Sequence, residues 1–533
     1  MKRCPGCGRE YDNTMMFCLD DGTELLYGPA SMDEPATAIL SERAEIATGY
    51  RAGEAKTAIF RSTIDPAIEN TNSIAVLPFA NMSADEENEY FCDGLAEDLL
   101  NALAKIDDLK VAARTSAFSF KGKKANVADI GKALNVNSIL EGSVRKSGDR
   151  LRITVQLINA ADGYHLWSEQ YNRRMQDIFD VQDEITLAVV DALKLKLLGS
   201  NKADVLKRHT ENTEAYKAFL LGRYLRHTKN DHSGAHKAFE EAVRLDPLSA
   251  PSWVALAEGT ILAAHYGIIH AREACERAKE CLATAEELQG ETADAYYVRG
   301  FVGFVEADWP TWEKAYRRAI EIQAGQVQVY GSFGLTLCVR GQFDEALIFF
   351  ERAREADPFA PFPYAITGAG MVTMGRHEDS LPYFEQAITF ERENLLTLWS
   401  SSLAHIALGN YAEGVTSAER GVEVSRRGGF FVGVLGWTYA VSGRTDDARA
   451  ILEELKKRPE NAPSLVPEVW LLAALGEKEA AFALLARADA ESQAFVNYVN
   501  LPGFDPLRGD SRFTDLIRRR GLPEIFASNR TKI

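Results

Sequence analysis

The chain has 533 residues, of which 26% are charged, and its formal net charge is −17. This length predicts about three to four domains rather than one core. The negative balance repels phosphate backbones and anionic lipid, so we do not expect nucleic-acid binding. The sequence has no run of about 18 apolar residues and no signal-peptide core, which predicts a cytoplasmic protein without membrane insertion.

The first 26 residues carry a cluster of candidate metal ligands. Cys4 and Cys7 form a Cys-x-x-Cys pair, and Cys18 is followed three residues later by Asp21. Thiolates and carboxylates both bind zinc, and the stretch resembles the short zinc ribbons of bacterial multidomain proteins. The resemblance implies one structural Zn²⁺ held by Cys4, Cys7, Cys18 and Asp21. Zinc ribbons usually have cysteine at the fourth position, Asp20 competes for it, and a metal-free knuckle is the alternative.

Residues 27–72 lack steady periodicity and are rich in small and charged residues, which predicts a flexible linker. Within the linker, Thr-Ala-Ile followed by a large apolar residue occurs twice, beginning at Thr37 and at Thr57. A phosphothreonine in such a segment can be recognised by an arginine-lined pocket of a partner. Thr37 and Thr57 are therefore candidate phosphorylation sites for a phosphothreonine reader. The alternatives are chance similarity or two short helical turns that dock on the body.

From residue 73 the pattern becomes that of an α/β domain. A short apolar run at 73–79 predicts a buried strand, and apolar residues at every second position of 151–158 predict a half-buried one. Apolar residues at helical spacing predict a helix over 89–104. The expected order is strand 73–79, helix 89–104, strand 108–113, helix 127–134, hairpin 138–144 and 151–158, strand 165–171 and helix 177–198.

Several phrases of this region occur in the order of one bacterial domain. SIAVLPFANMSADEENEYFCDGLAEDLLNAL, ARTSAFSFKGK, ILEGSVRKSGDRLRITVQLINAADGYHLWSEQYNR and DIFDVQDEI resemble the domain described as similar to the N-terminal part of TolB. The resemblance covers about residues 73–198. It implies an α/β domain that usually lies between a signalling output module and a tetratricopeptide array. The usual modules are a class III adenylate cyclase, a kinase or a winged helix; here the zinc knuckle and linker take their place.

Polar side chains of the α/β region offer one candidate small-molecule site. Asp93 begins an acidic cluster that continues at Glu97 and Asp98, and a short polar run follows the expected strand 108–113. Ligands often bind at strand ends of α/β sheets. The alternative is structural, because carboxylates favour the first turn of a helix and Thr-Ser often caps or turns. The candidate ligand residues are Asp93, Arg114, Thr115 and Ser116.

Residues 211–490 read as a tetratricopeptide array. Glycines at the expected turns between helices are 34, 34, 34 and 33 residues apart, which is the period of this repeat. We count seven or eight helix pairs, one with a longer second helix near 270–289. The aromatic residues of the array are expected in its core rather than facing its groove. The apolar residues of segment 491–533 predict that it caps the open end of the array. The turn glycines are Gly341, Gly375, Gly409, Gly443 and Gly476.

We expect a multidomain protein: zinc ribbon 1–26, linker 27–72, TolB-N-like α/β domain 73–198, all-α tetratricopeptide superhelix 211–490 and capping segment 491–533. No catalytic motif with the required spacing is present, so the expected function is a non-catalytic adaptor with no catalytic or cofactor-binding residues. Its partners would be other proteins bound in the tetratricopeptide groove, in a bacterial signalling pathway. The alternative is a small-ligand sensor that acts through the α/β domain and relays to the array.

Overall fold

The computed structural model divides into two compact units, Met1–Glu69 and Asn70–Ile533. It describes residues 72–85, 88–123, 125–195, 205, 208, 210–229, 231–458 and 464–528, and the backbone of three short strands near the N-terminus. In the first unit these strands pair antiparallel in the order β2-β1-β3. They are β1 (Lys2–Arg3), β2 (Glu10–Tyr11) and β3 (Leu26–Tyr27).

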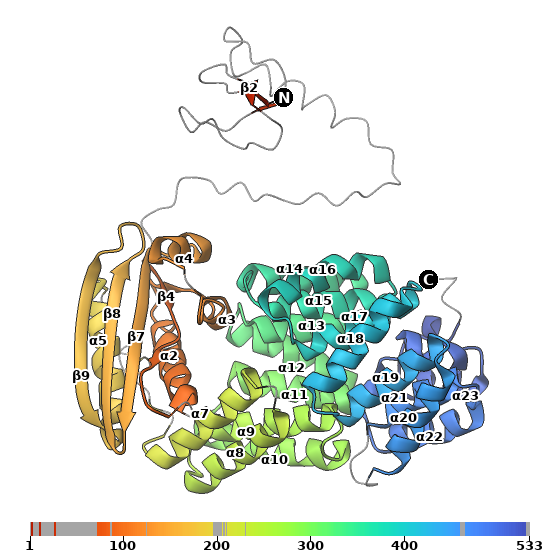
Figure 1. Cartoon of the computed structure of the whole chain (residues 1–533). Coiled ribbons are helices and arrows are strands. Elements are labelled where there is room, and N and C mark those ends of the chain that lie inside the picture. Colours follow the sequence, from red (N-terminus) through yellow and green to blue (C-terminus); the bar gives the residue numbers. More distant parts are fainter. Residues whose placement is uncertain are drawn as a thin grey trace. The chain divides into compact units, whose positions relative to one another are not determined.

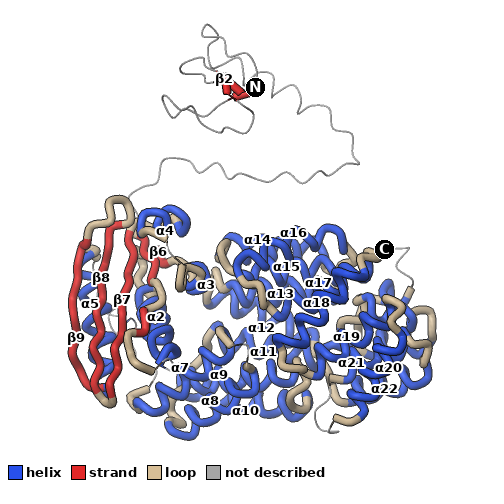
Figure 2. Tube along the Cα trace, in the orientation of Figure 1, coloured by secondary structure: helices blue, strands red, loops and turns tan. Residues whose placement is uncertain are grey.

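The second unit begins with a mixed sheet in the order β6-β4-β7-β8-β9, with β5 paired to β7 (Figures 1 and 2). β4 runs parallel to β6 and β7, whereas β7, β8 and β9 are successively antiparallel. The elements are β4 (Ser73–Val76), β5 (Ala80–Asn81), α2 (Glu89–Leu103), β6 (Lys110–Val111), α3 (Arg114–Phe118), α4 (Val127–Leu134), β7 (Ser138–Ser147), β8 (Arg150–Asn159), β9 (His165–Arg174), η3 (Met175–Asp177) and α5 (Ile178–Ala192).

One face of this sheet is buried under α2 and α5. Leu151, Ile153 and Val155 of β8 alternate with polar residues and are at most 2% exposed, as the period of two predicts. On the opposite face, α4 covers only the start of β7, where Ile130 packs with Ile139 and Ala160. The predicted α/β domain is therefore confirmed as a mixed-sheet domain. The predicted strand 108–113 is shorter in the structure, and the predicted helix 177–198 ends at Ala192.

Eight helix pairs follow in the described part of the chain, which confirms the predicted helical repeat array (Figure 1). The pairs are α7 (Thr213–His227) with α8 (His232–Leu245), α9 (Ala250–His265) with α10 (Ala271–Gln289), α11 (Ala293–Glu306) with α12 (Trp309–Ile322), α13 (Val327–Val339) with α14 (Phe343–Ala356), α15 (Pro361–Thr373) with α16 (His377–Phe390), α17 (Leu395–Ala407) with α18 (Tyr411–Val424), α19 (Gly429–Val441) with α20 (Thr445–Lys456), and α21 (Leu465–Ala474) with α22 (Lys478–Ala490). The two helices of each pair pack on each other, and neighbouring first helices also pack together, as α13 does with α15 and α19 with α21.

Glycine has two roles in these pairs. The predicted turn glycines all have positive φ, for example 81° at Gly375, which lets the chain reverse between helices. A second set lies inside the first helices and admits an aromatic ring from the second helix. A Cβ added at Gly368 would lie 2.4 Å from the Phe384 ring, and one at Gly334 would lie 2.8 Å from the Phe350 ring. The phenylalanines of the repeat signature thus fill space that a glycine leaves.

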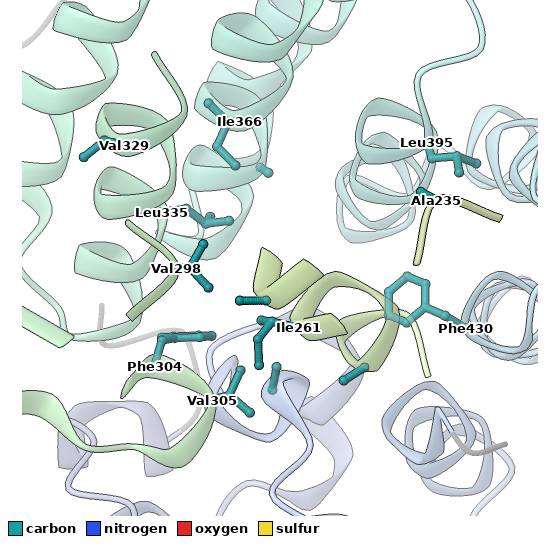
Figure 3. Packing of buried hydrophobic residues seen from close by; sticks show 14 of the residues in the cluster. Ala235, Ile261, Val298, Phe304, Val305, Val329, Leu335, Ile366, Leu395 and Phe430 are labelled. Carbon is teal, nitrogen blue, oxygen red and sulfur yellow. The ribbon is translucent and has the colours of Figure 1, made fainter. Parts of the chain in front are cut away.

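The inner helices share one apolar core with the segment that follows α22. Figure 3 shows side chains from several repeats in this core, among them Ile261 of α9, Val298 and Phe304 of α11 and Phe430 of α19. The final elements are η4 (Ala494–Asn497), η5 (Pro502–Leu507), α23 (Ser511–Arg519) and η6 (Glu524–Ala527). The position of these final elements determines which part of the inner surface of the array is accessible.

Candidate functional site

The candidate site is a cavity of about 880 Å³ between the α/β domain and the first four helix pairs. On one side it is lined by α2, the start of α3 and α5, and on the other by the first helices α7, α9, α11 and α13. The lining is about half polar and half apolar and contains charges of both signs. We call this cavity the junction groove.

A buried ion network closes one end of the junction groove, where α2 meets α7. The guanidinium of Arg223 pairs with Glu97 (Nη2 to Oε2, 3.0 Å) and with Asp98 (Nη1 to Oδ1, 3.1 Å). Arg114 adds a second cation, with its Nε 2.7 Å from Glu97 Oε2. Burial raises the pKa of Glu97, but Arg223 and Arg114 outweigh it and the net pKa is lowered. The Glu97 carboxylate is therefore ionised, and the ion pairs of Arg223 join α2 to α7.

The same contact depends on a tyrosine and on a small residue. Tyr216 of α7 donates a hydrogen bond to Asp98 (2.5 Å) and accepts one from Gln182 of α5 (2.6 Å). The two helices approach closely because α2 has glycine at position 94, where a Cβ would lie 2.6 Å from Leu220. Three helices of two domains therefore meet around one polar cluster, in which Arg223 is ion-paired while its buried Nε has no hydrogen-bond partner.

Further along the groove the lining is polar and less enclosed. Arg226 of α7 forms an ion pair with Glu258 of α9, and both side chains are less than a fifth exposed. Gln326 donates to Asp294 (2.9 Å), and Tyr297 lies between these pairs on the groove lining. The groove thus presents amide, hydroxyl and charged groups from successive first helices, which is the arrangement that suits an extended peptide with its own polar backbone.

At the far end of the groove, α3 is held by a carboxylate of the array. Thr115 and Ser116 each donate a side-chain hydrogen bond to Asp357, which follows α14 and is fully buried. Burial raises the pKa of Asp357 to about 6, against the opposite effect of the Ser116 hydrogen bonds. The α/β domain therefore touches the array at two separate places, α2 on α7 and α3 on Asp357, with the groove between them.

The structure brings together only part of the predicted small-molecule site. Arg114 and Thr115 line the groove, and Ser116 is buried against Asp357. Asp93 lies elsewhere, with its Oδ1 2.6 Å from Lys121 Nζ. Sequence reasoning missed Arg223 and Asp357, because a charge that is buried by a distant domain has no local signature. The predicted zinc ligands Cys4, Cys7, Cys18 and Asp21 and the candidate phosphosites Thr37 and Thr57 lie outside the described residues.

The chain's own C-terminal segment packs on inner helices of both early and later repeats. Phe495 packs against His265 of α9, Trp399 of α17 and Phe430 of α19, with ring centroids 4.4 to 5.6 Å away. Asn497 donates to the carbonyl of Phe304 (2.6 Å), and a neighbouring asparagine reaches the end of α15. The segment therefore runs across the inner helices from α9 to α19, and the junction groove lies beside it on the N-terminal halves of α9 and α11.

Aromatic residues of the array follow the prediction in most cases. Tyr330 and Trp399 are less than 10% exposed and belong to the core, whereas Tyr297 lines the groove. In the described part of the chain no helix is long and apolar enough to cross a membrane.

Comparison with known proteins gives partial matches. The family described as HilA/YgeH-like transcriptional regulator, second domain, matches residues 70–188, well under half of the chain. A curated protein of Rhizobium meliloti (strain 1021), named "Putative adenylate cyclase 3", is 38% identical over 193 residues. This match covers 36% of the present chain and 33% of that protein, so the chain spans about a third of the relative's length.

Solved structures resemble the array and, more weakly, the sheet domain. Yeast Tom70 is 17% identical with a TM-score of 0.35, over 59% of this chain and 60% of that chain. TolB from Acinetobacter baumannii is 19% identical with a TM-score of 0.18, over 24% and 29%. Likenesses of this size leave the resemblance to TolB unconfirmed. The tetratricopeptide-type architecture rests on the helix pairs and their spacing.

The relative corrects one expectation. We expected a chain that is not an enzyme because no catalytic spacing is recognisable in its sequence. That conclusion is wrong in the light of a 38% identical relative whose name is that of an enzyme. The enzyme activity is stated in the name of the relative and is not shown for this chain. The absence of a local motif is weak evidence against an enzyme, because distant segments can form a catalytic site together.

Proposed function

We propose that the chain is a protein-interaction module that binds a segment of a partner protein in the junction groove. The observation that carries this proposal is the division of the inner helices: residues 494–527 cover the C-terminal ends of α9 and α11 and parts of the later repeats, whereas the N-terminal halves of α9 and α11 line the junction groove. The groove is lined by four successive first helices, and its polar side chains can hydrogen-bond a peptide backbone while its apolar ones contact side chains.

The proposal extends to a signalling role in the cytoplasm. It is supported by the partial identity to a protein named as an adenylate cyclase, an enzyme class that makes a messenger nucleotide. It is also supported by the reduced state of Cys92, Cys275, Cys281 and Cys338, which are all buried free thiols. A partner bound in the junction groove would lie directly beside the α/β domain.

The test fills the groove and leaves the outside of the array unchanged. Ala255 of α9 lines the groove, and Ala283 of α10 is exposed outside it. Full-length wild type, Ala255→Trp and Ala283→Trp are used to capture proteins from a bacterial extract, and captured proteins are quantified by mass spectrometry. We expect partners that bind wild type and Ala283→Trp equally and are lost from Ala255→Trp. A capture profile that is the same for all three proteins would contradict a groove-bound partner.

A second function, a small-ligand sensor in the α/β domain, is favoured by one observation. The α/β domain contacts the array at two points, so a ligand that moved α3 would change the contact with Asp357 and the width of the groove. A ligand that binds there raises the melting temperature of the full chain. For the sensor, Arg114→Gln should abolish this shift and Ala255→Trp should leave it in place. For the interaction module, Ala255→Trp should abolish partner capture and Arg114→Gln should leave it in place.

A further inference from the structure

The outer face of the antiparallel part of the sheet carries a compact arginine cluster. Because side chains alternate along a strand, the residues between the buried ones of β8 point to the face that α2 and α5 leave uncovered. Arg150 and Arg152 of β8 lie on this face and are exposed. The strand register places Arg145 of β7 opposite Arg152 and Arg174 of β9 opposite Arg150. We call these four residues the arginine face (strands in Figure 2).

The four arginines are close together. Neighbouring strands are about 5 Å apart and alternate residues of one strand are about 7 Å apart, so the four Cα atoms occupy a patch about 10 Å across. Like charges directly opposite each other on neighbouring strands are destabilising. Here two such pairs share one patch, Arg145 with Arg152 and Arg150 with Arg174. Stability therefore does not explain the cluster, which points to a ligand that neutralises it.

The arginine face lacks counter-charges of its own. In residues 72–528 as far as they are described, no carboxylate forms an ion pair with Arg145, Arg150 or Arg174, and Arg152 donates from Nε to Asn172 Oδ1 (3.0 Å). The one acidic residue of β7 on this face, Glu141, is four positions from Arg145, about 13 Å along the strand. Asp177 accepts a hydrogen bond from the Arg174 backbone and caps the turn after β9.

Many exposed arginines of the array are ion-paired. They pair with acidic side chains of the same or the next helix, as Arg244 does with Glu241 and Arg317 with Glu313 and Glu345, whereas exposed Arg352, Arg392 and Arg426 have no ion pair in the described part of the chain. A chain with a net charge of −17 has ample carboxylates for such pairs. The arginine face is distinguished by the gathering of four arginines without ion pairs at neighbouring positions of one sheet face.

We propose that the arginine face binds a phosphorylated side chain of a partner protein. A phosphate monoester carries about two negative charges and three acceptor oxygens, and guanidinium groups bind it with paired, charge-assisted hydrogen bonds. Two opposed arginine pairs can surround one such group, and Asn172 holds the Arg152 guanidinium in place. The phosphate also removes the repulsion within each pair, so binding gains free energy that a neutral ligand would not.

The shape of the cluster favours a single dianionic group over a nucleic acid. A polynucleotide is bound along an extended basic track, and its affinity grows with the number of phosphates contacted. The arginine face is only about 10 Å across, and the net negative charge of the chain repels a long polyanion. This site is independent of the junction groove, which lies on the other side of α2.

The experiment uses the full chain and three peptide mixtures. Each mixture has randomised flanks around one fixed residue, which is phosphothreonine, threonine or aspartate. The peptides are immobilised, and binding is measured by interferometry for wild type and for the double variant Arg145→Gln with Arg174→Gln. The control double variant is Arg444→Gln with Arg449→Gln on the exposed surface of α20, which removes the same charge elsewhere.

We expect binding to the phosphothreonine mixture, at least about tenfold weaker binding to the other two, and a loss of about tenfold or more in the sheet variant alone. Raised salt should weaken the interaction. The proposal is overturned if no mixture binds, if threonine and phosphothreonine bind equally, or if both double variants lose affinity alike. Stronger binding to a single-stranded oligonucleotide, lost in the sheet variant, would assign the face to nucleic acid instead. Ala255→Trp should leave phosphopeptide binding unchanged, which separates this site from the groove.

Discussion

At the scale of single residues, the function-bearing features are charges whose partners come from far along the chain. Asp357 receives hydrogen bonds from Thr115 and Ser116, which lie 242 and 241 positions away in the sequence. Arg145 faces another arginine across the sheet. In both cases the surroundings of the side chain come from residues that are distant in sequence. For Asp357 they should change the pH dependence of stability, and for Arg145 they should change stability through charge repulsion.

The Asp357 carboxyl group should make stability depend on pH. Its folded pKa of about 6 lies above the ordinary value of 3.8, so the folded chain binds this proton more tightly. The contribution is complete below about pH 4 and is lost as pH rises through about 6. Asp357→Asn removes the ionisation, so its unfolding free energy relative to wild type should rise by about 1–3 kcal/mol between roughly pH 4.5 and 7.5.

Urea unfolding at the two pH values measures this difference. Asp446→Asn on the exposed surface of α20 is the matched control and should not change relative to wild type between them. Parallel pH profiles for wild type and Asp357→Asn would contradict the buried carboxyl at this position.

Relief of repulsion should be visible at Arg145. Arg145→Gln removes one member of a directly opposed arginine pair and breaks no ion pair in the described structure, so the free energy of unfolding should rise by about 0.2–1 kcal/mol. Arg449→Gln, which removes an ion pair with Glu477, should leave stability unchanged or slightly lower. If Arg145→Gln destabilises the chain in low salt, the arginine is stabilising the sheet and the argument for the arginine face weakens.

The zinc site stays a prediction at this scale. Three thiolates and one carboxylate fit the preferences of Zn²⁺ and would hold the ion as a fold-stabilising centre. The expected result is one zinc per chain by elemental analysis, and weaker binding after Asp21→Ala because a ligand is lost. Asp20→Ala is the control. Unchanged affinity in Asp21→Ala together with a loss in Asp20→Ala would move the fourth ligand to position 20.

At the scale of elements, the array is assembled by glycines that accept an aromatic ring. Gly368 lies in the first helix of its pair, and the Phe384 ring of the second helix fills the space where a Cβ would stand. In an exposed helix interior, glycine is worse than alanine by about 1 kcal/mol. At this position helix propensity favours alanine and packing favours glycine. Packing is the larger effect, because an added Cβ would lie only 2.4 Å from the ring.

Gly368→Ala should therefore lower the free energy of unfolding by about 1–3 kcal/mol, despite the better helix propensity of alanine. Gly421→Ala in α18 is the matched control, because its nearest neighbour is 3.4 Å away, and it should be neutral or stabilising by up to about 1 kcal/mol. Chemical denaturation of both variants checks the contrast. Equal effects at the two positions would show that ring packing does not select the glycine.

At the scale of the whole second unit, two contacts join the α/β domain to the array and leave the junction groove between them. The α2–α7 contact depends on one cation, Arg223, that serves both Glu97 and Asp98. Removing a partner from a buried ion pair leaves a charge without compensation. The chain's last elements cover the inner surface beyond the groove. The packing that joins the two domains therefore also sets which part of the inner surface is accessible.

Arg223→Met should destabilise the second unit by about 3 kcal/mol, because two buried carboxylates lose their shared partner. Arg317→Met is the control: Arg317 also pairs with two acids, but it is 43% exposed, so a change below about 1 kcal/mol is expected. The urea midpoint of the sheet and array transitions measures both. A small effect at Arg223 would mean that the α2–α7 contact does not hold the domains together.

The sequence by itself determined the local elements. The period of two in β8, the helical spacing in α2 and the 34-residue glycine period are properties of neighbouring residues, so they could be read before any fold was known. Helix 127–134 matches its prediction at both ends. These patterns depend on short-range geometry and on the burial of one face of a strand or helix. The spacing of apolar residues along the sequence therefore predicts them.

Only the tertiary structure decided where the chain offers a site. The groove lining, the contact of Thr115 with Asp357, the filling of the later inner surface by Phe495 and the opposition of Arg145 to Arg152 all join residues that strand register or domain packing brings together. The expectation that the chain is not an enzyme relied on local motifs, and a relative named as an adenylate cyclase contradicts it. Burial, charge pairing and register are set by long-range packing, and they determine which side chains are left free to bind.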